Sequence, residues 1–138
     1  MAASGVITVT TDFGHQGPFV GVMKGCILAR FPGARIIDLT HEILVHWPAE
    51  AGFWLARAYP YFPAGTVHVA VVDPGVGTSR AIVVAEAGGH IFVAPDNGLL
   101  APELAAGIAR THGGHFLSRS ALPSQARCDK SAPHRAVY

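Results

Sequence analysis

Residues 65–80 read GTVHVAVVDPGVGTSR, and this stretch decides which fold the chain can adopt. Gly65–Asp73 is rich in β-branched residues and predicts a strand with an acidic residue at its carboxyl end. The loop that follows, Pro74–Ser79, contains two glycines, which allow a backbone to approach a ligand closely or to take a positive φ. The stretch therefore predicts a strand that presents Asp73 and a glycine-rich loop at one edge of a sheet.

Two strand–helix units precede this stretch. The pattern predicts strands at Gly5–Thr11 and Ala34–Thr40, followed by helices at Pro18–Phe31 and Ala49–Tyr59. The first strand has the composition of a strand buried in a parallel sheet. Because strands and helices alternate, we expect right-handed crossovers and a mainly parallel sheet.

Apolar spacing on the predicted helices indicates which residues belong to the core. Cys26 lies in the middle of the first helix, at helical spacing from Val22, and is expected to be buried. The apolar face of the second helix includes Phe53 and Leu55, and core packing is also expected for Trp47.

The pattern changes in the second half of the chain. Arg80–Ala87 and His90–Ala94 predict two strands joined by a Gly-Gly hairpin turn. A turn at Pro95–Gly98 leads to a predicted helix at Leu99–Arg110, and the signal fades from Thr111 onward.

The expected fold is one α/β domain over residues 1–110, followed by an atypical tail at residues 111–138 that is truncated or poorly ordered. Its mainly parallel sheet lies between flanking helices in a Rossmann-like three-layer arrangement. The 138 residues, 50% hydrophobic and 14% charged, are enough to bury one core.

Charge and composition exclude several classes of function. A formal net charge of +1 gives no polybasic signature, so no nucleic-acid or membrane partner is expected. No apolar run reaches the roughly 18 residues that span a bilayer, and the first residues carry no leader pattern. Two distant cysteines predict no disulfide framework. We expect a soluble, cytoplasmic protein.

Polar residues follow three of the predicted parallel strands. Asp12, His41 and Asp73 each come at or just after a strand end, and parallel strands bring these ends to one edge of the sheet, where α/β proteins bind ligands. The alternative is that such residues only cap turns and the helices that follow. The presence of all three residues at one edge of the sheet favours a functional site there.

The loop after Asp73 is the most informative segment. Arg80 returns toward Asp73 at the start of the next strand, and an acid and a guanidinium held together can orient a water molecule and a polar substrate. The loop is neither a Walker A motif nor a GxGxxG motif. A glycine-rich turn with a purely structural ion pair remains the alternative.

Other polar residues carry weaker signals. Asn97 belongs to a turn that also suits the rim of a site, and His46 or Trp47 could stack on an aromatic ligand. His68 alternates on a strand and is expected to pack or to be exposed rather than to bind a ligand. The eight histidines show no convincing metal spacing, so no metal and no cofactor are expected.

Five blocks, in order, resemble one family. The blocks are residues 7–14 (ITVTTDFG), 20–25 (VGVMKG), 37–43 (IDLTHEI), 62–78 (FPAGTVHVAVVDPGVGT) and 94–100 (APDNGLL). Together they look like the S-adenosylmethionine (SAM) hydrolases, also called SAM hydroxide adenosyltransferases, which are relatives of the fluorinases and chlorinases. The likeness covers roughly residues 5 to 105.

The resemblance implies a reaction in which water or hydroxide attacks the ribose C5′ of SAM, and adenosine and methionine are released. Asp73 and Arg80 match two catalytic positions of the family, and Asp12 matches the acid that holds the ribose hydroxyls. Phe13, His46 and Asn97 are the other substrate-binding positions that it implies. A halogenase is disfavoured because those relatives lack this Asp, whose carboxylate would repel a halide.

The sequence departs from the family in three respects. The family's third catalytic residue, a His in a Phe-His-Gly-Arg-Asp segment, has no match, and Gly17 replaces a common acid. The family also has a C-terminal β-barrel domain, which we expect to be absent here, and forms homotrimers with sites shared between chains.

Three functions therefore remain open. The first is a SAM hydrolase, with SAM as substrate. The second is a catalytically incomplete N-terminal domain that binds a ligand or self-associates. The third, a metal-dependent phosphohydrolase using Asp12 and Asp73, lacks a clear third ligand.

Overall fold

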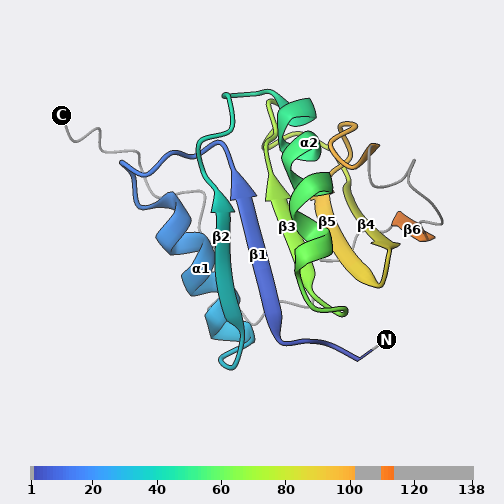
Figure 1. Cartoon of the computed structure of the whole chain (residues 1–138). Helices are drawn as coiled ribbons and strands as arrows, with labels where there is room; N and C mark the ends of the chain where they lie inside the picture. Colours follow the sequence, from blue (N-terminus) through green and yellow to red (C-terminus); the bar gives the residue numbers. More distant parts are fainter. Residues whose placement is uncertain (1, 102–109, 114–138) are drawn as a thin grey trace.

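The strands predicted from the sequence form one six-stranded sheet in the structure, a computed structural model that describes residues 2–101 and 110–113 (Figure 1). The elements, in chain order, are β1 (Val6–Thr11), α1 (Phe19–Arg30), β2 (Arg35–Thr40), α2 (Pro48–Ala58), the 3-10 helix η1 (Tyr59–Tyr61), β3 (Val67–Val71), β4 (Ile82–Ala87), β5 (His90–Pro95) and β6 (Arg110–Gly113). The strands follow the order β2-β1-β3-β5-β4-β6 across the sheet.

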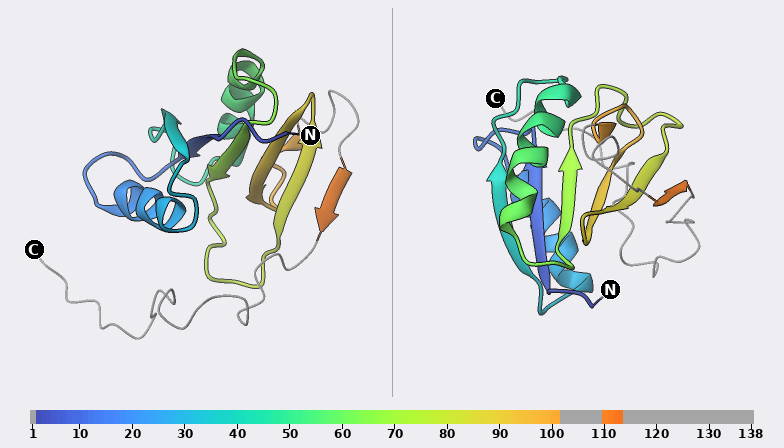
Figure 2. Two further views of the ribbon diagram at one scale, coloured as in Figure 1. Left: turned by 90° about the horizontal axis from the view of Figure 1, so that it is seen from below. Right: turned by 45° about the vertical axis from the view of Figure 1, so that its right-hand side comes forward.

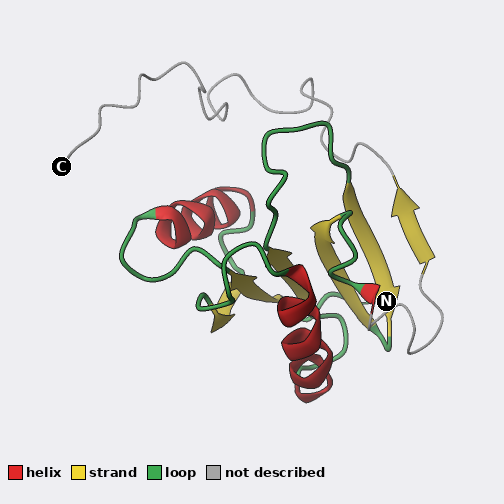
Figure 3. Cartoon of the chain, turned by 90° about the horizontal axis from the view of Figure 1, so that it is seen from above, coloured by secondary structure: helices red, strands yellow, loops and turns green. Residues whose placement is uncertain are grey.

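The sheet is mainly parallel, as the alternation of strands and helices predicts. β1 pairs in parallel with both β2 and β3, and β3 pairs in parallel with β5. β4 runs antiparallel to β5 and β6. The helices α1 and α2 lie on opposite faces of the sheet, which gives the expected three layers (Figures 2 and 3).

The main core lies between α2 and the sheet. Ala51 and Leu55 of α2 are buried against a cluster that includes Ala70 of β3 and Phe92 of β5. Burial of a Leu or Phe side chain contributes about 1.5–3 kcal/mol, so this face fixes α2 over the middle of the sheet. Pro48 begins the helix, where its missing N–H has no cost.

Several apolar residues expected in the core are exposed. Cys26 is exposed, and α1 buries none of its residues. The prediction for Cys26 was wrong because apolar residues surround this helix on several sides, and only one side can face the sheet. Phe53 and Trp47 are also 44% and 53% exposed, so their apolar character did not place them in the core.

The end of the described chain differs from the prediction. Leu99 and Leu100 form a turn and Ala101 is helical, but the rest of the predicted helix lies outside the described residues. Arg110 is not the end of a helix: it begins β6, which pairs with the free edge of β4. The segment has no run of β-branched residues, so it forms a strand only because it pairs with the edge of β4. The pattern of apolar residues in the sequence does not reveal such a pairing.

Two buried histidines lie near the amino-terminal ends of β3 and β5, away from the functional edge. His68 Nδ1 lies 2.7 Å from Thr8 Oγ1, and His68 Nε2 lies 3.2 Å from His90 Nδ1. The ring of His68 stacks on Phe92 at a centroid distance of 5.1 Å. Burial, with a smaller contribution from His90, lowers the pKa of His68 to about 4, and burial also lowers the pKa of His90. The prediction of a packed His68 is confirmed.

These lowered pKa values predict that acid destabilises the fold. Below about pH 6.5 the unfolded chain takes up protons that the folded His68 and His90 do not bind, so the free energy of unfolding falls as the pH drops toward about 4. One such histidine contributes up to about 1.4 kcal/mol per pH unit in this window. Urea unfolding at several pH values measures the slope.

The variant His68→Gln tests the assignment, because it keeps a neutral polar side chain that does not titrate. We expect a smaller slope in this variant than in the wild type. Equal slopes in the wild type and His68→Gln would contradict the assignment.

Candidate functional site

The carboxyl ends of four neighbouring parallel strands form the candidate site. Because Thr11 of β1 is in register with Val71 of β3, Asp12 and Asp73 follow adjacent strands at the same edge. Asn97 comes two residues after β5, on the other side of β3. The expectation that these strand ends share one edge is confirmed.

An ion pair closes the base of the glycine-rich loop. Arg80 Nε lies 2.9 Å from Asp73 Oδ1, and the same oxygen accepts a hydrogen bond of 2.8 Å from the Gly75 N–H. Arg80 Nη1 donates to the carbonyl of Asp96 at 3.2 Å. The return of Arg80 to Asp73, expected from the spacing, is confirmed. The pair presents a carboxylate and a guanidinium together, which suits a polar ligand or a bound water.

Gly75 makes room for this ion pair. A Cβ atom at this position would lie 2.5 Å from Arg80 Nη2 and 2.9 Å from Arg80 Nε. The guanidinium therefore packs directly on the backbone of the loop, and a side chain at residue 75 would displace it. This use of a glycine for close approach, rather than for positive φ, explains one of the two glycines in the loop.

A hydrogen bond from the loop before α2 holds the side chain of Asp12. Its Oδ2 accepts a hydrogen bond of 3.0 Å from the backbone N–H of His46. His46 has a φ of 63°, the only positive value for a non-glycine residue in the described part of the chain. Such a conformation costs of order 1 kcal/mol and is found in structures where surrounding contacts impose it. His46 itself is exposed.

Asn97 and Phe13 occupy different environments at this edge. Asn97 Nδ2 donates to the carbonyl of Val72 at 2.8 Å, and its Oδ1 accepts from the Leu99 N–H at 3.2 Å. Asn97 therefore ties the loop after β5 to the end of β3. Phe13 is 36% exposed, and its ring makes an edge contact with Phe19.

His41, the remaining polar residue expected at a strand end, lies beneath the edge. It is 1% exposed, and its Nδ1 lies 2.8 Å from Thr11 Oγ1. Its Nε2 faces Asp38, which also receives a 2.6 Å hydrogen bond from Lys24. Partial burial would raise the pKa of Asp38, but the bond from Lys24 and the contact with His41 outweigh it and lower that pKa.

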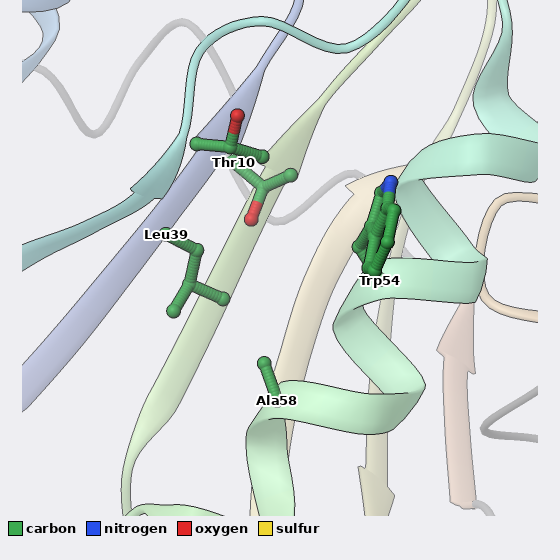
Figure 4. Close-up of a pocket in the computed structure, with 5 residues that line it drawn as sticks. Thr10, Leu39, Trp54 and Ala58 are labelled. Carbon is green, nitrogen blue, oxygen red and sulfur yellow. The ribbon is translucent and has the colours of Figure 1, made fainter.

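A cleft of about 410 Å³ lies below this edge, between α2 and the sheet (Figure 4). It is lined by Thr10, Leu39, Thr40, Trp54 and Ala58. Thr10 Oγ1 is buried and has no hydrogen-bond partner among the described residues. Sequence reasoning missed this cleft. Trp54 has the apolar character of a core residue but is 49% exposed on one wall.

Neither a metal-binding cluster nor a membrane-spanning helix is found in the described residues. Residues 2–101 and 110–113 contain no group of three or more His, Cys, Asp or Glu side chains that could hold a metal ion. Within the same ranges, no helix has the length and apolar character needed to cross a membrane.

Comparison with known proteins relates these residues to one family. Residues 7–120 match the family described as the SAM hydroxide adenosyltransferase N-terminal domain. The "(R)-S-adenosyl-L-methionine hydrolase" of Salinispora arenicola is 45% identical over 100 residues, which cover 72% of this chain and 38% of that protein. The protein of the same name from Methanocaldococcus jannaschii is 46% identical, over 68% of this chain and 37% of its own length.

A more distant curated relative and a solved structure also match this chain. A fluorinase from Actinoplanes sp. is 30% identical over 72% of this chain and 42% of that protein. The crystal structure of a conserved hypothetical protein from Thermus thermophilus superimposes with a TM-score of 0.67 at 40% identity, covering 75% of this chain and 43% of that one. The chain spans about two fifths of the length of the curated relatives that it matches.

The packing of Arg80 on Gly75 predicts a selective effect of a methyl group. Gly75→Ala is expected to displace the guanidinium from Asp73 and to shift the Arg80 Nε–H signal in a ¹⁵N NMR spectrum. The free energy of unfolding should change by less than about 1 kcal/mol, because a flexible side-chain end can move aside.

Gly21→Ala is the matched control, because a Cβ there meets nothing within 4 Å. It should leave the Arg80 signal in place. An unchanged signal in Gly75→Ala would show that the loop does not hold Arg80 in this way.

Proposed function

Because the chain belongs to the SAM hydroxide adenosyltransferase family, whose N-terminal domain it contains, we propose that it acts in the hydrolysis of S-adenosyl-L-methionine to adenosine and methionine. The observation that carries the proposal is the Asp73–Arg80 ion pair, 2.9 Å long, at the sheet edge that also bears Asp12. Four curated relatives with the name of this hydrolase support the reaction at the level of the family.

The proposed reaction is a displacement at the ribose C5′. The oxygen of a water molecule forms a bond to C5′ while the C5′–S bond breaks. The electron pair of that bond goes to sulfur, which leaves as the neutral thioether of methionine. The attacking water releases one proton to the solvent and keeps the other, so its oxygen becomes the 5′-hydroxyl of adenosine. The positive sulfonium is already a good leaving group, so the protein must chiefly orient the nucleophile and favour its deprotonation.

Asp73 and Arg80 are the proposed catalytic residues. Arg80 stabilises the developing hydroxide by its charge, and the Asp73 carboxylate accepts a hydrogen bond from the water and so fixes its direction. The side chain of Asp73 is only 11% exposed, which restricts competing water around this group. The same carboxylate disfavours a halide as nucleophile.

Asp12 is the proposed ligand of the ribose hydroxyls. Its carboxylate can accept two hydrogen bonds from a diol, and the His46 N–H holds it in place. Phe13 and His46 are exposed and are the proposed ring contacts of the substrate, and Asn97 keeps the neighbouring loop in position. No metal ion or cofactor is part of this proposal.

We also propose that a second copy of the chain covers this edge in a homotrimer. Large apolar side chains next to the site support this arrangement, because Phe19 and Trp47 are 65% and 53% exposed. Exposed apolar surface of this kind is typical of protein interfaces.

The activity is tested by incubating the purified chain with SAM and measuring adenosine by chromatography. We expect release by the wild type and a loss of about 100-fold or more in Asp73→Asn, which keeps the size of the side chain but not its charge. Asp12→Asn should mainly raise the KM, because it weakens binding of the ribose.

Glu86→Gln provides the matched control, since Glu86 is an exposed carboxylate on β4 outside the site. Adenosine that binds without any SAM turnover would favour the alternative of a ligand-binding domain. A folded chain that neither releases nor binds adenosine would refute the proposal.

A further inference from the structure

We propose that His41 is a positioning residue, which sets the direction of the Asp12 carboxylate through a chain of contacts that runs from the partly exposed Lys24–Asp38 pair to the buried His41 and Thr11. This inference rests on the proposed function, in which Asp12 binds the ribose. His41 is 1% exposed and therefore acts on the ligand only through the residues that it holds.

The side-chain contacts of His41 join the ends of β1 and β2. Its Nδ1 lies 2.8 Å from Thr11 Oγ1, and Thr11 Oγ1 also accepts a hydrogen bond of 3.2 Å from the Phe13 N–H. With a neutral imidazole, the Thr11 hydroxyl donates to Nδ1 and keeps a lone pair for Phe13. One hydroxyl thus connects the buried ring to the residue that follows Asp12.

The other side of the ring faces a charged pair. His41 Nε2 lies 3.0 Å from Asp38 Oδ1, which is an electrostatic contact without the alignment of a hydrogen bond. The Nε2 proton is favoured there because it faces a carboxylate, and this leaves Nδ1 as the acceptor for Thr11. Lys24 Nζ holds the other oxygen of Asp38 at 2.6 Å, so α1 anchors the chain of contacts.

Backbone hydrogen bonds complete the attachment. The Gly14 N–H donates to the His41 carbonyl at 2.8 Å, and the Ile43 N–H donates to the Thr11 carbonyl at 3.4 Å. Contacts with His41 therefore fix the chain on both sides of Asp12, at Thr11 before it and at Phe13–Gly14 after it. The His46 N–H in turn binds the Asp12 carboxylate.

The same strand offers a matched control three residues earlier, at Thr8. Thr8 Oγ1 and His68 Nδ1 are 2.7 Å apart, and both residues are fully buried, like Thr11 and His41. This second pair lies among core rings and touches no proposed site residue. Loss of either threonine hydroxyl leaves a buried imidazole nitrogen unpaired, which costs about 1–3 kcal/mol.

The experiment compares Thr11→Val with Thr8→Val in the full chain. We expect both to lower the free energy of unfolding, but only Thr11→Val to weaken adenosine binding in calorimetry, by about tenfold. Thr11→Ser, which keeps the hydroxyl, should restore the affinity to within about twofold of the wild type.

A second readout does not depend on ligand binding. The amide proton of His46 is bonded to the Asp12 carboxylate, so its NMR chemical shift reports where that carboxylate lies. Thr11→Val should move this signal, and Thr8→Val should not. Equal effects of the two variants on this signal and on adenosine affinity would overturn the positioning role.

The two readouts also separate this inference from the proposed function. If the wild type binds no adenosine, the function proposed for Asp12 fails, while the His46 signal still decides whether His41 positions Asp12. If adenosine binds normally to Thr11→Val, the function stands and the positioning role is wrong.

Discussion

The parallel pairing of β1 on both of its sides is the constraint on which the site depends. β1 lies between β2 and β3, and the register of these pairs aligns the ends of all three strands. Each strand then turns into a loop at the same edge, so residues separated by some sixty positions, such as Asp12 and Asp73, become neighbours across the sheet. A shift of one residue would also send every side chain of β1 to the opposite face.

Because side chains alternate along β1, its threonines lie on opposite faces of the sheet. Thr8 and Thr10 point to the face that α2 covers, where Thr8 meets His68 and Thr10 lines the cleft beside Trp54. Thr11 points to the other face, toward His41 and the side of α1. The hydroxyls of Thr8 and Thr11 suit these positions, because a β-branched side chain packs well in a strand and still bonds to a buried imidazole. The polar residues of this strand are therefore part of its packing.

The sequence predicted the elements that have a local signature. Val67–Val71 and Val6–Thr11 are β-branched runs, and Pro32-Gly33 and Pro48 mark helix ends, so their placement follows from short-range chemistry. The return of Arg80 to Asp73 also followed from its spacing. The exposure of Cys26 and Trp47, the pairing of β6 and the cleft at Thr10 could not be predicted, because each depends on which surfaces meet in three dimensions.

The loop between β3 and β4 is anchored at its base, because Arg80 is paired with Asp73 and packs on Gly75. The number of residues in this loop is therefore constrained, whereas an ordinary surface loop can vary in length. An inserted residue would either break the ion pair or advance the chain by one step as it enters β4, which would exchange the two faces of that strand. Substitutions at exposed positions such as Val76 leave this geometry intact. The segment should therefore tolerate changes of side chain but not insertions or deletions.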